Sequence, residues 1–223
     1  MRSPLLVPRI AIVDPELTYT MPQEVTASTG LDALTQLIES YVSNKANPLT
    51  DGICIEGMKR AVRSLSAAYL SGDASAREDM SIASLFSGLA LANAKLGAVH
   101  GLAAPLGGNL SARHGMICAR LLPFVVEHNI NSLMKLDPTS DHVRRFDTVA
   151  KIMTNDDHAS ARDAVAWLKN ICSELMIIPL GELGLKDAAI SVIARQAIKS
   201  SSTKGNPVEV TEEELADILR RAM

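Results

Sequence analysis

Apolar residues recur at intervals of three and four along most of the chain, which is the spacing of a helix with one buried face. From Pro22, a favourable first-turn residue, this pattern continues to Val42. It predicts a helical region that Gly30 divides into two helices. The apolar positions that share its face, and that we expect to pack against a core, are Val25, Leu31, Leu34, Leu37, Ile38 and Val42.

The same spacing continues downstream and predicts further helices over residues 50–69, 76–97, 114–128, 142–153, 159–176 and 211–221. The helix that begins at Ala76 has a charged first turn and is then almost uncharged and rich in Ala, Gly and Ser. Because such a helix is apolar on every side, we expect it to lie at the centre of the fold. The last helix opens with Thr211 followed by Glu214, which is the spacing of a capping box.

One strand is predicted, at the start of the chain. Residues 9–15 form a short β-branched run that Asp14-Pro15 closes. No low-complexity tract and no repeat of solenoid length interrupts the rest of the sequence. The expectation is therefore a single all-α domain over residues 1–223, a helical bundle with one short N-terminal strand.

Composition narrows the functional classes. The chain has 22 basic and 25 acidic residues and a formal net charge of −3, which argues against nucleic-acid binding. Hydrophobic residues make up 47% of the chain but aromatic residues only 3%, a balance that favours aliphatic helix packing. No apolar stretch reaches the roughly 18 residues of a membrane span, and Pro4, Pro8 and Arg9 interrupt any signal-peptide core. We therefore expect a cytoplasmic protein without a membrane partner.

The cysteines support the same location. Cys54, Cys118 and Cys172 are odd in number and far apart, so they fit neither a disulfide framework nor a CxxC metal site. We expect all three to be buried, inert thiols in a reducing compartment.

Four residues could carry chemistry. Asp32 and Gln36 are four positions apart, so on one helix their side chains project from the same face. His100 closes the apolar helix and His114 opens the next one, so both imidazoles could converge with the carboxylate and the carboxamide on one divalent cation. Spacing alone leaves a structural alternative open, in which Asp32 caps a turn, Gln36 is solvated and His100 is a core residue. Surface roles are expected for His128, His142 and His158.

Several motifs occur in an order that resembles the iron-containing (group III) alcohol dehydrogenases. The resemblance extends over essentially the whole chain and corresponds to the C-terminal helical half of that family, the bundle of the dehydroquinate synthase-like fold. The matching segments are AIVDPELT at 11–18, TASTGLDALT at 26–35, NPLTD at 47–51, GAVHGLA at 97–103, PLG at 105–107, HG at 114–115, LLP at 121–123, GNP at 205–207 and TEE at 211–213.

The resemblance implies a metal site. In the family, an Asp and three His of the helical domain hold one Fe²⁺ or Zn²⁺ at a cleft that faces an N-terminal nucleotide-binding domain. Asp32, His100 and His114 match three of these ligands, and Gln36 stands where the family has the remaining His. An amide oxygen is usually a poorer donor to these metals than an imidazole nitrogen, so we expect weaker or less selective binding. Gln36 either ligates the metal or holds a water that does.

Ala104 is a second departure, because many members have a His there, close to the nicotinamide. A proton relay of the family's usual form is therefore doubtful, and no catalytic residue is assigned beyond the metal ligands.

The largest departure is that no Gly-rich pyrophosphate loop occurs in the sequence. We expect that the nucleotide-binding domain is absent from this chain, which is then a fragment, a truncated product or half of a split enzyme. NAD(P) would bind only if such a domain were supplied, and its binding residues stay unassigned.

The function that the resemblance implies is hydride transfer between an alcohol and nicotinamide, with the metal as Lewis acid. The alternatives are a maleylacetate reductase-like or glycerol dehydrogenase-like oxidoreductase, or an inactive helical module. The expected partners are a small alcohol or aldehyde, a separate nucleotide-binding half and a second copy of the chain in a dimer.

Overall fold

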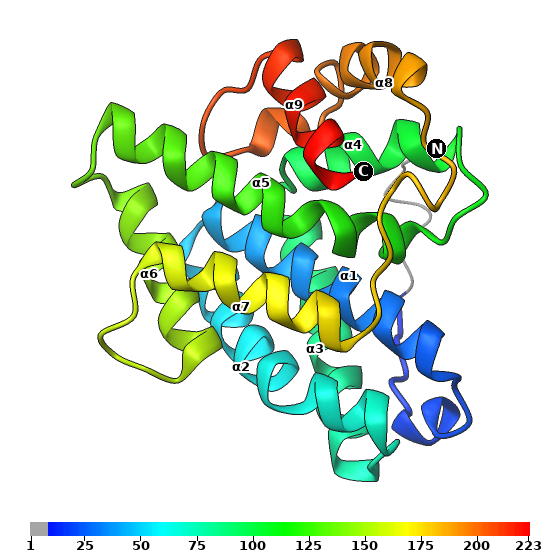
Figure 1. Cartoon of the computed structure of the whole chain (residues 1–223). Helices are drawn as coiled ribbons and strands as arrows, with labels where there is room; N and C mark the ends of the chain where they lie inside the picture. Colours follow the sequence, from blue (N-terminus) through cyan, green and yellow to red (C-terminus); the bar gives the residue numbers. More distant parts are fainter. Residues whose placement is uncertain (1–8) are drawn as a thin grey trace.

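The computed structural model describes residues 9–223, and Figure 1 shows that its regular elements are helices. The all-α class is confirmed. In chain order the α-helices are α1 (Gln23–Val42), α2 (Pro48–Leu70), α3 (Ala74–Asn93), α4 (Ala98–Gly107), α5 (His114–Leu136), α6 (Asp141–Thr154), α7 (Ala161–Glu174), α8 (Ile190–Ala197) and α9 (Glu212–Ala222). Short 3₁₀ turns are η2 (Pro15–Thr18), η3 (Asp187–Ala189) and η4 (Thr203–Gly205).

The predicted N-terminal strand is wrong. Residues 10–14 run without regular structure until the Asp14 carboxylate caps η2 by accepting from the amide of Glu16. The side chains of Ile10 and Ile12 are 81% and 89% exposed. A strand needs a neighbouring ladder to pair with, and the described part of the chain offers none to this run.

The predicted division of the first helix at Gly30 is also wrong, because α1 is continuous from Gln23 to Val42. Gly30 is buried where α1 crosses α2, and a Cβ at this position would lie 2.4 Å from Cδ1 of Leu65. The glycine therefore permits close approach of two helices instead of ending one.

The centre of the bundle is formed by α1, which packs on α2, α3 and α5 (Figure 1). The prediction that the helix from Ala76 lies at the centre is wrong, because α3 packs on α1 and α2 from one side and leaves Leu89 and Leu91 exposed. Among residues 9–223, no single helix is long and apolar enough to cross a membrane. Within the same residues, one helix pair, α3 and α4 bent by 100°, passes that test together.

The ends of the helices follow local signals. The capping box predicted at the last helix is confirmed, since the Thr211 hydroxyl accepts from the Glu214 amide at 3.2 Å and the Glu214 carboxylate accepts from the Thr211 amide at 2.8 Å. Asn47 and Thr50 form another capping box at the start of α2. The helix α8 was not predicted.

Candidate metal centre

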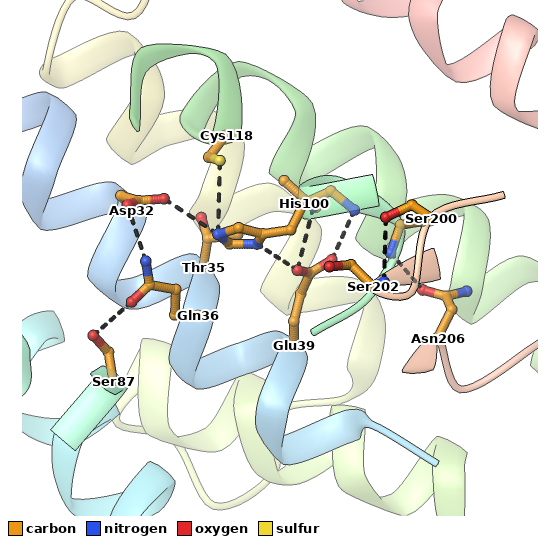
Figure 2. Close-up of polar contacts among 12 residues, drawn as sticks. Asp32, Thr35, Gln36, Glu39, Ser87, His100, Cys118, Ser200, Ser202 and Asn206 are labelled. Atoms are coloured by element: carbon orange, nitrogen blue, oxygen red, sulfur yellow. Dashed lines mark hydrogen bonds and ion pairs between the residues drawn. The ribbon is translucent and has the colours of Figure 1, made fainter. Parts of the chain in front are cut away.

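Three helices bring four metal-binding side chains to one point. Asp32 comes from α1, His100 from α4, and His114 and Cys118 from α5, and one ligand atom of each lies within 4.8 Å of the others. We call these four residues the donor cluster. Figure 2 shows Asp32, His100 and Cys118 turned toward one another.

Asp32 contributes an oxygen with no hydrogen-bond partner. Its Oδ1 is buried, makes no hydrogen bond within the described part of the chain, and lies 3.4 Å from Nε2 of His100 and 3.8 Å from Nε2 of His114. Burial raises the pKa of Asp32, but the close contact with His100 and the charge of that ring, and then the charge of His114, hold it below its usual value. A buried carboxylate oxygen without a donor is costly, and a cation bound here would satisfy it.

His100 is oriented by a second carboxylate. Its Nδ1 lies 2.7 Å from Oε2 of the buried Glu39, so Nδ1–H donates to Glu39 and Nε2 faces Asp32. Burial lowers the pKa of His100, but its close contacts with Asp32, Cys118 and Glu39 raise it to about 12. A carboxylate behind a histidine in this way fixes the ring and makes its other nitrogen a better ligand.

Glu39 also fixes the helix that carries His100. Its Oε1 accepts from the amide of Val99 at 2.7 Å, in the first turn of α4, where the helix dipole favours an anion. The side chain of Asn206 accepts from the preceding amide at 3.2 Å. His100 was expected to close the preceding helix. That helix ends at Asn93, and His100 lies in the first turn of a separate helix.

His114 stands at the first position of α5, on the open side of the donor cluster. Its side chain is 51% exposed, whereas that of His100 is 7% exposed. The next residue, Gly115, lies against α1, and a Cβ there would come within 2.2 Å of the carbonyl oxygen of Ser28. This contact holds the start of α5 beside the helix that carries Asp32.

Gln36 lies beside the donor cluster and is hydrogen-bonded at both ends of its amide (Figure 2). Its Nε2 donates to Oδ2 of Asp32 at 3.0 Å, and its Oε1 accepts from the hydroxyl of Ser87 on α3 at 2.7 Å. Because an ionised carboxylate can only accept, the amide presents its NH₂ group to Asp32 and its oxygen to Ser87. The structure thus places Gln36 where it orients Asp32, and its role as a ligand stays a prediction.

Cys118 is the member of the donor cluster that sequence reasoning missed. All three cysteines are buried as predicted, and burial raises the pKa of each to about 12. Cys118 differs in its neighbours, since its Sγ lies 3.4 Å from Nε2 of His114 and 3.9 Å from Nε2 of His100. Its position four residues after His114, on the same helix face, was the signal that could have identified it.

The remaining candidates lie elsewhere. Ala104 is exposed on α4, one turn after His100. The other three histidines are not part of the donor cluster, and they lie on α5, on α6 and in the loop before α7: His128, His142 and His158.

Comparison with known proteins places this geometry in a family. The model of the Fe-containing alcohol dehydrogenase family, C-terminal, matches residues 26–223. The chain belongs to this family. The iron-containing alcohol dehydrogenase from Thermococcus thioreducens superposes on it with a TM-score of 0.87 at 30% identity, over 99% of this chain and 56% of that one.

Two relatives show how much of a family member the chain represents. It is 36% identical to the 1,3-propanediol dehydrogenase of Citrobacter freundii over 97% of this chain and 55% of that protein. It is 32% identical to the NAD-dependent methanol dehydrogenase of Bacillus methanolicus over 98% of this chain and 57% of that protein. The chain spans about half the length of the relatives it matches, in agreement with the C-terminal helical part of an iron-containing alcohol dehydrogenase.

Proposed function

We propose that this chain is the metal- and substrate-binding half of a metal-dependent, NAD(P)-linked alcohol dehydrogenase. The observation that carries the proposal is the convergence of Asp32, His100 and His114 from three helices, with a buried carboxylate oxygen that has no hydrogen-bond donor within the described chain. Membership of the family supports the reaction class, which is hydride transfer between an alcohol or aldehyde and nicotinamide. The named activities of the two relatives, on 1,3-propanediol and on methanol with NAD, agree with it.

The residues present fit a divalent cation such as Fe²⁺ or Zn²⁺. One carboxylate oxygen and two imidazole nitrogens are donors that both metals accept. A metal bound there would act as a Lewis acid toward the substrate oxygen.

The side chains around the cluster have separate tasks in this proposal. Glu39 holds His100 with Nε2 directed at Asp32, and Gln36 with Ser87 holds the carboxylate of Asp32 in its orientation. His114 is half exposed, so the substrate reaches the cluster from its side. The methyl group of Ala104 can neither accept nor donate a proton, so the substrate proton has to pass to another acceptor.

Binding of NAD(P) would require a nucleotide-binding half. Because these 223 residues have no Gly-rich pyrophosphate loop, such a half would hold the cofactor next to the donor cluster. A homodimer and a cytoplasmic location stay predictions.

The second candidate function is an inactive helical module, and the two substitutions at Gln36 and Ala104 favour it. Maleylacetate reductase-like and glycerol dehydrogenase-like activities are alternatives within the same reaction class. A panel of alcohols and aldehydes, assayed with a nucleotide-binding domain added, separates these substrates from one another and from the inactive module, which gives no turnover.

The metal content of the purified protein tests the proposal. We expect elemental analysis to find Fe²⁺ or Zn²⁺ in the parent chain and more of it in a Gln36→His variant, because an imidazole is the stronger donor. Equal and negligible metal in both proteins would favour the inactive module. Circular dichroism of both checks that the substitution leaves the helices intact.

A further inference from the structure

We propose that Cys118, as a thiolate, is the fourth protein ligand of the cation and takes the place that Gln36 does not fill. The centre would then be an Asp–His–His–Cys site with a preference for Zn²⁺. This inference rests on the proposed function, because it requires the donor cluster to hold a cation.

The positions of the donor atoms carry the argument. In a tetrahedral zinc site, with Zn–N and Zn–O bonds of about 2.0–2.2 Å and a Zn–S bond of about 2.3 Å, neighbouring donor atoms lie roughly 3.3–3.7 Å apart. Sγ of Cys118 lies 3.4 Å from Nε2 of His114 and 3.9 Å from Nε2 of His100. Oδ1 of Asp32 lies 3.4 Å from His100 and 3.8 Å from His114. Four of the six separations among these atoms are thus close to what one tetrahedral ion requires, and the other two are below 4.8 Å.

The helix geometry explains why the sulfur is there. His114 and Cys118 are four residues apart on α5, so their side chains project from the same face, and the start of α5 is fixed against α1 at Gly115. Cys118 has an exposed fraction of 0%. Its Sγ faces the two imidazole rings and lies beside the carboxylate of Asp32.

Both ends of the Gln36 amide are already hydrogen-bonded. Its amide oxygen accepts from Ser87, and its NH₂ group faces the carboxylate of Asp32. To ligate a cation through its oxygen, Gln36 would have to break both hydrogen bonds and turn an oxygen toward an anion. Cys118 needs no such rearrangement.

Charge also favours the thiolate. When the cation binds, the S–H bond of Cys118 breaks, its proton leaves to solvent, and the sulfur electron pair forms the bond to the metal. The anionic ligands Asp32 and Cys118 then balance a divalent cation, which lowers the cost of holding it in a mostly buried site. A thiolate is a soft ligand, which favours Zn²⁺ over Mn²⁺ or Mg²⁺, and the general affinity order places Zn²⁺ above Fe²⁺.

Cobalt absorption tests the inference directly, because Co²⁺ replaces Zn²⁺ and a thiolate bound to it gives a charge-transfer band in the near ultraviolet. We expect this band in the parent chain loaded with Co²⁺ and its loss in Cys118→Ala and Cys118→Ser. The chain offers matched controls, since Cys54 and Cys172 are equally buried but outside the donor cluster. A double variant, Cys54→Ala with Cys172→Ala, leaves Cys118 as the only thiol and should keep the full band.

Affinity provides a second readout. Loss of a residue that merely supports a metal ligand costs about 10–100-fold in affinity, so loss of a ligand should weaken Zn²⁺ binding by more than about 100-fold in Cys118→Ala. The double variant should bind Zn²⁺ as the parent does, as measured by competition with a chromophoric chelator.

The outcomes separate this inference from the proposed function. If the parent binds one Co²⁺ without the charge-transfer band, or if the band persists in Cys118→Ala, the inference is overturned and the metal site stands. If the parent binds neither Co²⁺ nor Zn²⁺ in equilibrium dialysis, both fail. Should Cys118→Ala not fold, the double variant still decides, because absence of the band there overturns the inference.

Discussion

Two carboxylates that lie between packed helices of this bundle differ in their hydrogen bonding. Asp79 on α3 accepts four hydrogen bonds, two from Arg63, one from Arg60 and one from Ser64, at 2.6–2.8 Å. Asp32 on α1 has one oxygen held by Gln36 and the other without any donor within the described chain. Both oxygens of Asp79 are therefore satisfied by hydrogen bonds, whereas one oxygen of Asp32 is not.

The difference lies in the kind of side chain that surrounds each carboxylate. The hydrogen bond of Arg63 is the largest influence on Asp79, and with the Ser64 hydroxyl it lowers the pKa to about 2 despite partial burial. The neighbours of Asp32 are instead imidazoles and a thiol, which are common metal ligands in proteins. A carboxylate that joins α2 to α3 is therefore structural, whereas the one at the junction of α1, α4 and α5 is suited to a cation.

The largest expected effect is on metal binding, in Asp32→Asn. Replacing the anionic ligand by a neutral amide should weaken Zn²⁺ affinity by more than about 100-fold, since even supporting residues contribute 10–100-fold. Competition with a chelator measures the change, and Asp79→Asn is the matched control that should bind Zn²⁺ like the parent. Equal affinity in parent and Asp32→Asn would contradict the comparison.

Glu39→Gln should have the next largest effect. The amide can still accept from one donor but no longer presents an anion to Nδ1 of His100, so the ring loses the partner that orients it. We expect Zn²⁺ affinity to fall by about 10–100-fold. The same titration measures it, and circular dichroism shows whether α4 stays folded, because Glu39 also accepts from Val99. An affinity within a factor of two or so of the parent would mean that Glu39 serves only the helix.

Asp79→Asn should act on stability alone. Hydrogen bonds to charged groups each contribute about 1.5–3 kcal/mol, but Arg63 is 57% exposed and water replaces part of what it loses. The expected decrease in the free energy of unfolding is about 2 kcal/mol, measured by urea denaturation at neutral pH. Asp32→Asn, without a bound metal, should lose less than this.

Acid should remove the stabilisation that the ionised Asp79 carboxylate gives to the parent. Because the folded-state pKa of Asp79 is lowered to about 2 from an ordinary 3.8, the stabilisation is fully present above pH 4 and is lost as pH falls through 2. The stability difference between parent and Asp79→Asn should therefore shrink steadily between pH 4 and pH 2 in urea titrations. A difference that stays constant over this range would show that Asp79 acts through packing and not through its charge.

Local patterns predicted most of the helices, and packing decided where they failed. The capping box at Thr211 is a signal contained within four residues, and it was predicted correctly. The start of α2 was predicted at residue 50, but the helix begins at Pro48 with Asn47 as its cap. Gly30 was misread because its reason lies on another helix, at Leu65. The helix α8 is only eight residues long and follows a 3₁₀ turn, so its apolar spacing was too brief to stand out.

The donor cluster could be predicted only in part, because some of its contacts join residues that are far apart in the sequence. Asp32, His100 and His114 were identified through motifs, and the structure brings them together. Glu39 supports His100 from 61 positions away, a contact with no local signal. Cys118 did have a local signal, its spacing from His114. Spacing alone, however, does not distinguish a metal ligand from a buried, inert thiol.

The smallest expected effect concerns the far end of the Asp32 hydrogen-bond chain. Ser87→Ala removes the hydroxyl that donates to Gln36 at 2.7 Å, leaving the amide held only by Asp32. One neutral hydrogen bond contributes about 1 kcal/mol, so Zn²⁺ affinity should fall by less than about tenfold. Ser64→Ala, which removes the matching hydroxyl from Asp79, should leave Zn²⁺ affinity unchanged and lower stability by a similar amount. If Ser87→Ala also lowers only stability, then Gln36 does not orient the metal-binding carboxylate, and the two carboxylate sites are more alike than their geometry indicates.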